Sequence, residues 1–193
     1  MAADCTRFDI ELLLRSFRNG LKLRRRDLSG LDLSGLDLSG TDFTGSLLVN
    51  VSLLDARLAG ACFSRCNLSG ADFSRASAST TNWNGALARK ACFRAADLFN
   101  ASFVRAQLEE SDFSQSRAVQ ANFVCGVFDH SRFHSADLAR ADFMGARLTG
   151  CAFDRESRLD GARMDAADAD RLLSDAQRSM LLATDAGHDS YYG

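Results

Sequence analysis

The sequence contains no proline, has almost no net charge and lacks any long apolar run. A chain without proline can pair every backbone N–H, which suits an uninterrupted hydrogen-bond ladder. The formal charge of −2 argues against a general polyanion-binding protein. No segment is apolar enough to span a membrane, and the N-terminal MAADCTRFDI lacks the order of a signal peptide. The six cysteines form no CxxC pair, so we expect reduced thiols in a cytoplasmic protein.

What the sequence has instead is a repeat of five residues, which begins in RRRDLSGLDLSGLDLSG. Steps of five from Leu23 to Phe153 meet 27 positions, called centres below, of which 24 are Leu, Phe or Trp and three are Ala. A small column lies two residues before each centre. From Thr41 to Cys151 it holds 23 residues, and all but Val51 are Ala, Ser, Thr, Cys or Gly. Neither a helix nor a two-sided strand has this period.

The period predicts a coil with four sides. Two inward residues in every five, one large and one small, fit a short bridge followed by a tight corner. Four such units make a turn of 20 residues, and stacked turns lie about 4.8 Å apart, the spacing of hydrogen-bonded strands. Glycine at many corners supplies the positive φ that such a turn needs.

These residues resemble the pentapeptide-repeat family, whose signature is A(D/N)Lxx. Matching segments are ADFSR at 71–75, ADLFN at 96–100, ANFVC at 121–125, ADLAR at 136–140 and ADFMG at 141–145. The resemblance implies an all-β fold, a right-handed quadrilateral β-helix with short helical caps. We assign residues 1–20 to an N-terminal helical cap, 21–165 to the solenoid, and 166–193 to a C-terminal helix and tail.

Aromatic residues add a second period inside the first. From Phe63 onward every second centre is aromatic, with Phe128 as the one extra ring. Two opposite sides of the coil should therefore carry aromatic ladders that stack along the axis. Trp83 lies between the alanine centres Ala78 and Ala88, which we interpret as compensation for the indole volume, the alternative being a small binding cavity.

Both ends of the solenoid carry helical patterns that can cover its open edges. In TRFDIELLLRSFRNG, Thr6 or Asp9 is the candidate N-cap, and Gly20 is the stop. The predicted buried stripe of this helix consists of Leu12, Leu13 and Phe17. The small column fails in the first coil, where leucines at 21, 31 and 36 should pack against this helix.

Near the C-terminus, Ser174 and Gln177 form a capping-box pattern, and Gly187 is the candidate stop. The apolar run Met180, Leu181 and Leu182 follows this pattern. It either caps the last coil or mediates a homodimer, as the C-terminal region does in gyrase-protecting members of the family.

The sequence contains no recognisable catalytic motif and only one loosely metal-like spacing. The spacing of Cys125, His130 and His134 is loosely zinc-like, but five-residue steps place them on different sides of the coil. The aspartates that precede the centres belong to the repeat. We therefore expect no enzyme activity, no cofactor, no metal, no membrane contact and no direct nucleic-acid binding, and we expect a protein partner.

The resemblance implies one specific partner class, because the best-known activity of the family protects DNA gyrase and topoisomerase IV from quinolone-type inhibitors through DNA mimicry. Acidic residues are concentrated in the first coils, which makes Asp32, Asp37 and Asp42 candidate partner-binding residues. The solenoid as a whole is nearly neutral, with 18 basic and 17 acidic residues between Leu21 and Asp165. A scaffold or effector-like module with an unidentified protein partner is the alternative.

A second candidate interface consists of apolar residues directly after three centres. Val104, Val124 and Met144 recur once in every predicted turn, so they should stack in consecutive coils on one side. The strip is either a dimer or partner contact, or a surface covered by the C-terminal helix.

Overall fold

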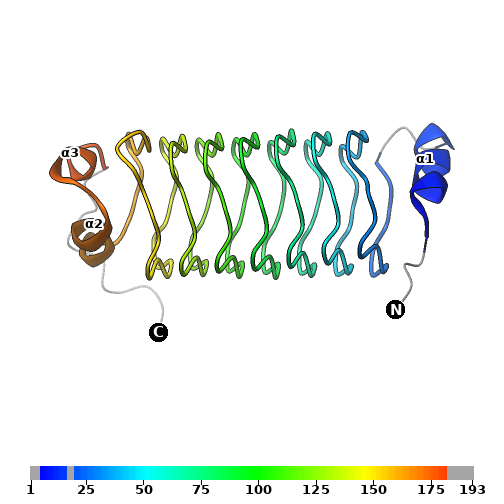
Figure 1. Cartoon of the computed structure of the whole chain (residues 1–193), viewed down its shortest axis with the longest axis horizontal. Helices are drawn as coiled ribbons and strands as arrows, with labels where there is room; N and C mark the ends of the chain where they lie inside the picture. Colours follow the sequence, from blue (N-terminus) through cyan, green and yellow to red (C-terminus); the bar gives the residue numbers. More distant parts are fainter. Residues whose placement is uncertain (1–4, 17–19, 182–193) are drawn as a thin grey trace.

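The computed structural model describes residues 5–16 and 20–181, and most of this chain forms a row of stacked coils (Figure 1). Helix α1 (Arg7–Ser16) lies at the N-terminal end of the row. Helices α2 (Ala166–Leu172) and α3 (Asp175–Arg178) lie at the other end. None of the helices in the described ranges has the length and hydropathy needed to cross a bilayer.

Consecutive coils are joined by isolated parallel β-bridges. Asn122, for example, pairs with Ser102 in the preceding coil and with Asp142 in the following one. Near the C-terminal end Asp137 pairs with Arg158, because one residue is inserted after the last five-residue step. Bridges recur at every fifth position, so each coil has four of them. The predicted 20-residue turn is confirmed, and the handedness of the coil stays a prediction.

Backbone hydrogen bonds explain why one unit needs five residues. The N–H of Phe103 donates to the carbonyl of Asn122 in the next coil (2.7 Å), and the N–H of Asn122 donates to Ala101 (2.9 Å). The chain then turns, with the N–H of Ala106 donating to the carbonyl of Phe103 (3.0 Å). Arg105 lies inside this turn with φ 57°, as in a type II β-turn. We call the residue two positions after a centre the corner residue.

The centres fill the axis of the coil, as the repeat predicted. Two aromatic ladders run along opposite sides. In the first, Trp83 stacks between Phe63 and Phe103, with ring centroids 4.4 and 5.4 Å away. In the second, Phe93 stacks on Phe113 at 4.7 Å, and rings of the two ladders meet edge to face. This arrangement combines apolar burial with the ring geometry that aromatic pairs favour.

The environment of Trp83 agrees with volume compensation. Its side chain is fully buried, and its Nε1–H donates to the hydroxyl of Thr81 (2.6 Å). Ala78 and Ala88 are also buried. Small centres on both flanking sides are compatible with space for the indole, and volume compensation stays an interpretation.

The N-terminal helix was predicted correctly, but its buried stripe was wrong. Thr6 is the N-cap, because its hydroxyl accepts from the N–H of Asp9 (3.3 Å). Ile10 is fully buried, whereas Leu12 and Leu13 are 54% and 36% exposed. The third predicted stripe residue, Phe17, lies outside the described residues.

A contact to the first coil explains which side of α1 faces inward. The guanidinium of Arg7 donates to the carbonyls of Asp32 (2.9 Å) and Ser34 (3.2 Å). Arg7 and Ile10 lie on nearby positions of the helix, so this anchor turns Ile10 toward the core. Leu31 and Leu36 are partly buried and pack against the core cluster, of which Ile10 of α1 is a member. Their contact with the helix itself stays a prediction.

The C-terminal end contains two short helices where the sequence suggested one. The predicted capping box is confirmed, since Ser174 and Gln177 exchange side-chain-to-backbone hydrogen bonds at the start of α3. The amide of Gln177 also donates to the carbonyl of Asp154 (2.7 Å), which fastens α3 to the last coil. Gly187, the predicted stop, lies outside the described residues.

All six cysteines lie in the described ranges, and each is a thiol rather than half of a disulfide. Burial raises the pKa of both Cys66 and Cys151 to about 12, so these two thiols stay protonated near neutral pH. Their role is that of small core residues in the column before the centres.

Candidate binding surfaces

The outer surface of the solenoid is organised by ion pairs between neighbouring coils. Arg117 bonds Asp97 at 2.9 Å, and Arg75 bonds Asp55 at 2.6 Å, in each case from one coil to the next. Most carboxylates of the solenoid take part in ion pairs. Those paired are Asp32, Asp37, Asp42, Asp55, Asp97, Glu109, Glu110, Asp112, Asp129, Asp137, Asp142 and Asp160. Much of the negative charge is therefore balanced locally, although each exposed pair contributes little stability.

The three candidate aspartates lie in the first coils, but not on one side. Asp32, Asp37 and Asp42 occupy successive bridge positions of the coil and so project from three different sides. The side chains of Asp32 and Asp37 are 69% and 55% exposed, whereas that of Asp42 is 20% exposed. They do not form a single acidic patch.

Arginines from other parts of the chain lie beside these aspartates. Asp32 lies 3.5 Å from Arg7 of α1. Asp37 lies 3.6 Å from Arg57 in the next coil. Hydrogen bonds from the hydroxyl and N–H of a serine two residues later hold the pKa of Asp32 and of Asp37 below its ordinary value. Both carboxylates are therefore ionised at neutral pH.

The apolar strip of Val104, Val124 and Met144 lies where the five-residue repeat predicted it. Val104, Val124 and Met144 follow stacked centres in three consecutive coils, and the backbone N–H of Arg105 donates to the carbonyl of Val124 (3.1 Å). All three strip residues are half-buried rather than fully exposed. At the end of the strip, the carboxylate of Asp165, the N-cap of α2, accepts from the N–H after Met144 (3.0 Å).

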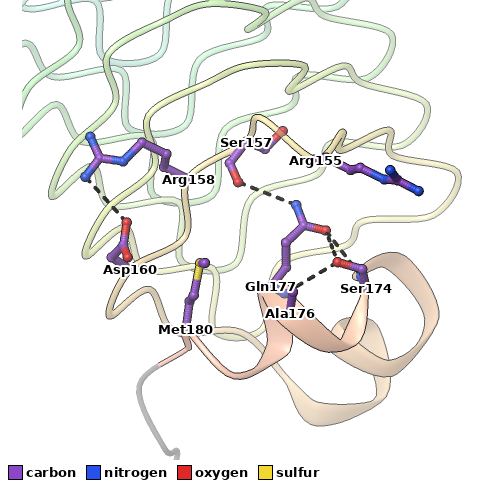
Figure 2. A pocket seen from close by; sticks show the side chains of 8 residues that line it. All are labelled: Arg155, Ser157, Arg158, Asp160, Ser174, Ala176, Gln177 and Met180. Atoms are coloured by element: carbon purple, nitrogen blue, oxygen red, sulfur yellow. Dashed lines mark hydrogen bonds and ion pairs between the residues drawn. The ribbon is translucent and has the colours of Figure 1, made fainter.

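The second apolar candidate, at the C-terminal end, is only partly described. Met180 is 44% exposed and Leu181 is half-buried, whereas Leu182 lies outside the described residues. Met180 borders a pocket of about 510 Å³ between α3 and the last coil (Figure 2). Ser157 and Gln177 line this pocket, and the amide of Gln177 donates to the backbone carbonyls of Asp154 (2.7 Å) and Ser157 (3.5 Å), which attaches the helix to the coil.

The polar side chains that drew attention in the sequence do not converge. Cys125 and His130 are corner residues of successive sides, and His134 follows the next centre. The ring of His130 packs on Gly150 of the following coil. Among residues 5–16 and 20–181, no group of three or more His, Cys, Asp or Glu side chains is placed to hold a metal ion.

Sequence reasoning missed one edge of the coil, which combines exposed leucines and arginines. Leu47 and Leu87 are 38% and 40% exposed. They lie beside the corner column that contains Arg25, Arg65 and Arg105. The sequence signal was present, because these arginines recur in every second turn, but a search at period five does not detect it.

Comparisons with known proteins address the repeat directly. The model of the family described as pentapeptide repeats matches this chain in 8 copies, over residues 27–65, 66–103, 84–115, 101–137 and 111–150. No curated protein sequence matches the chain.

Several solved structures are similar. Full-length QnrB1, a plasmid-mediated fluoroquinolone resistance protein, has 22% identity and a TM-score of 0.41, with 79% of this chain and 95% of that chain covered. A pentapeptide repeat protein of the Arabidopsis thaliana thylakoid lumen has 29% identity and a TM-score of 0.29, covering 53% of this chain and 58% of that chain. HetL, involved in heterocyst differentiation regulation in the cyanobacterium Nostoc sp. strain PCC 7120, has 19% identity and a TM-score of 0.26, covering 81% and 96%.

Proposed function

Since the chain belongs to the pentapeptide-repeat family, we propose that it is a non-enzymatic binding protein with a right-handed solenoid and a protein partner. The packed axis supports this proposal. Side chains such as Phe103, Phe113 and Phe123 fill the coil completely, which leaves binding to the outer surface. We propose a reducing, cytoplasmic setting, which the six free thiols support.

We propose type II topoisomerase, meaning DNA gyrase or topoisomerase IV, as the first partner to test. In this hypothesis the protein protects the enzyme from quinolone-type inhibitors by partial DNA mimicry. The observation that supports it is the pair of ionised, exposed carboxylates Asp32 and Asp37 in the first coils. Asp42, which is less exposed, extends the negative charge to a third side.

A second function remains a specific candidate, namely a scaffold or effector-like module with a different protein partner. The cross-coil ion pairs favour it, because a DNA mimic needs unbalanced negative charge along its length. Along one side of this solenoid, Asp97 is followed by Arg117 and then by Asp137. Such alternation weakens any long-range negative field.

A supercoiling assay distinguishes the two functions. We would titrate the protein into gyrase with a fluoroquinolone present and measure recovery of supercoiling. Rescue that weakens in an Asp32→Asn, Asp37→Asn and Asp42→Asn triple variant supports topoisomerase protection. The matched control replaces three paired aspartates of later coils, Asp97, Asp112 and Asp137, with asparagine. No rescue at large excess, together with no binding to gyrase subunits, would leave the scaffold as the better hypothesis.

For self-association, we propose a homodimer through the C-terminal region, with Met180, Leu181 and Leu182 as its candidate contacts. The exposed fraction of Met180 supports this proposal. The hydrogen bond from Gln177 to the last coil supports the alternative, in which α3 only caps the solenoid. The measurement that separates them is the oligomeric state of a Met180→Glu variant.

A further inference from the structure

Among the residues that the structure describes, three arginines on one corner column of the coil have no ionic partner. Arg25, Arg65 and Arg105 are exposed corner residues that follow the ladder of Phe63, Trp83 and Phe103. No carboxylate within the described ranges lies within ion-pair distance of any of them, although 12 carboxylates of the solenoid are paired elsewhere.

Corner geometry does not forbid an ion pair, as another corner of the same coil demonstrates. Arg75 has the same corner conformation as Arg65, with φ 57° in both. Arg75 bonds both carboxylate oxygens of Asp55, one coil below, at 2.8 and 2.6 Å. Below Arg65 and Arg105 the corresponding residues are Gly45 and Gly85. The charge on this column is therefore left available for a partner.

Exposed leucines lie next to the same column. Leu47 and Leu87 come two residues after Gly45 and Gly85, just past the corner. Within residues 20–165 these are the two large apolar side chains that the structure leaves exposed, by 38% and 40%. Single exposed leucines need no explanation, but two that share one edge with unpaired arginines do.

The register of the coils makes arginine and leucine alternate along this edge. The N–H of Gly45 donates to Ser64 (3.0 Å), and the N–H of Arg65 donates to Asn84 (3.1 Å), so the corners stack directly. Leu47 and Leu87 each form a parallel bridge with the residue between them, Asn67. Cation and apolar side chain therefore each recur every second coil, about 9.6 Å apart.

Between positions 44 and 127 the edge contains no negative charge. At the C-terminal end of the same column, the carboxylate of Asp165 accepts from the N–H of Gly145 (3.0 Å). The corner segments 44–47, 64–67, 84–87, 104–107 and 124–127 contain neither Asp nor Glu, and the acidic residue in line with them is Asp27 of the first coil. A surface with cations, apolar side chains and no carboxylate complements a partner surface with carboxylates and apolar side chains.

We propose that this edge, defined by Arg25, Leu47, Arg65, Leu87 and Arg105, binds an acidic amphipathic α-helix of a partner protein. Two turns of α-helix advance about 10.8 Å, which is close to the two-coil repeat of the edge. Carboxylates on every second helical turn bind the arginines, and apolar side chains between them cover the leucines. The edge is separate from the acidic residues of the topoisomerase hypothesis, so this inference does not depend on it.

The leucines distinguish a protein helix from a nucleic acid. Burying the leucine side chains stabilises a complex only when the partner places apolar surface against them. A phosphodiester backbone offers charge to the arginines but no apolar groups at the same spacing. A helix with acidic and apolar positions on one face offers both.

The test uses a synthetic probe. The probe is a fluorescein-labelled, alanine-based helical peptide with glutamate on every second turn and leucine midway between, and its control has glutamine instead of glutamate. We expect saturable binding of the acidic peptide by fluorescence anisotropy at moderate salt, weakened as salt rises. The control peptide should bind at least about tenfold more weakly.

Variants of the edge identify the site. Arg65→Gly with Arg105→Gly keeps the fold, because glycine suits positive φ and already occupies this corner in alternate coils. This pair, and separately Leu47→Asn with Leu87→Asn, should each weaken binding by about tenfold or more. Arg140→Gly is the matched control, since Arg140 is an exposed corner residue with φ 59° and no ion pair within the described part of the chain.

Four results would overturn the proposal. The acidic peptide does not bind, or the glutamine peptide binds equally well. Arg140→Gly weakens binding as much as the edge variants, which indicates unspecific charge attraction. A DNA duplex of similar length binds the edge as tightly at the same salt and loses affinity in the arginine variants alone, which indicates a nucleic-acid site.

Discussion

Replacing Gly126 with alanine should destabilise the solenoid, although alanine is otherwise the commonest residue of the small column. Phe128 is the extra aromatic centre, and Gly126 lies two residues before it. A methyl group at position 126 would lie 2.5 Å from Cε2 of Phe128 and 3.1 Å from the carbonyl oxygen of Phe123. The ring of Phe128 is fully buried between the two aromatic ladders, so it has little room to move.

The magnitude follows from two opposed effects. Overpacking a dense core costs about 1–3 kcal/mol. Exchanging glycine for alanine raises the free energy of unfolding by about 0.4–1 kcal/mol, because alanine restricts the unfolded chain. This gain applies at Gly126 because its φ is not positive. We therefore expect Gly126→Ala to lower the free energy of unfolding by about 1–2 kcal/mol.

A double-mutant cycle isolates the contact. Phe128→Leu removes the ring, and with Gly126→Ala it recreates the alanine–leucine pairs at Ala106/Leu108 and in the coil beyond. In the leucine background, Gly126→Ala should be neutral or stabilising, which gives a coupling of about 2 kcal/mol. Urea unfolding followed by circular dichroism measures all four proteins. If Gly126→Ala is harmless in the wild type, or if the coupling is below about 0.5 kcal/mol, the explanation by ring contact is wrong.

Two further predictions concern the core and the apolar strip. Phe113→Asp should abolish the folded circular-dichroism spectrum, because an unpaired charge would lie on the axis. Phe113→Leu should lower the free energy of unfolding far less. An unchanged melting temperature of the aspartate variant would contradict the assignment of Phe113 as a buried centre. Val124→Glu should convert a dimer into a folded monomer if the strip is an interface, measured by light scattering. Lower stability without a change of assembly would instead indicate that the C-terminal helix covers the strip, and no effect on either would make it ordinary surface.

Most of the fold could be predicted because its core follows one short period. Each centre packs on the centres 20 residues before and after it, in the coils directly below and above. The sequence alone was therefore enough to place Trp83 beside Phe103. The capping box at Ser174 was equally local, since it depends on residues three apart. Local and strictly periodic interactions leave a direct trace in the sequence.

The buried side of the N-terminal helix was harder to predict. It is decided by how α1 docks on the first coil and not by the apolar pattern of the helix. Helix α1 has apolar residues on several sides, and the sequence offered Leu12 and Leu13 as the stripe. The structure buries Ile10 because Arg7 bonds the backbone of the first coil beside it. A hydrogen bond to a backbone carbonyl leaves no compositional signal.

The acidic first coils illustrate a different limit. Counting charges along the chain suggests an unbalanced cluster around Asp37, whereas the 20-residue turn aligns Asp37 with Arg57 and predicts an ion pair between them. In the coil, charges are compensated across layers, as Asp37 is by Arg57 and Asp42 is by Arg24. Partners in neighbouring coils look unrelated in the sequence until the period is used to align charges as well as apolar residues.

The fold constrains the identity of the corner residues less than that of the centres, which is why the corner residues are informative about binding. A centre must fill the axis, and the small column must let the walls approach. A corner only has to tolerate positive φ, which glycine does best and arginine does with strain. Within the described part of the chain, Arg65 and Arg105 occupy such corners without an ion pair. The same corner one coil below holds a glycine in each case, Gly45 and Gly85. Neither the core nor the hydrogen-bond ladder requires these arginines. Their alternation with the exposed Leu47 and Leu87, which the corner of Arg140 lacks, is the observation that supports a partner contact at this edge.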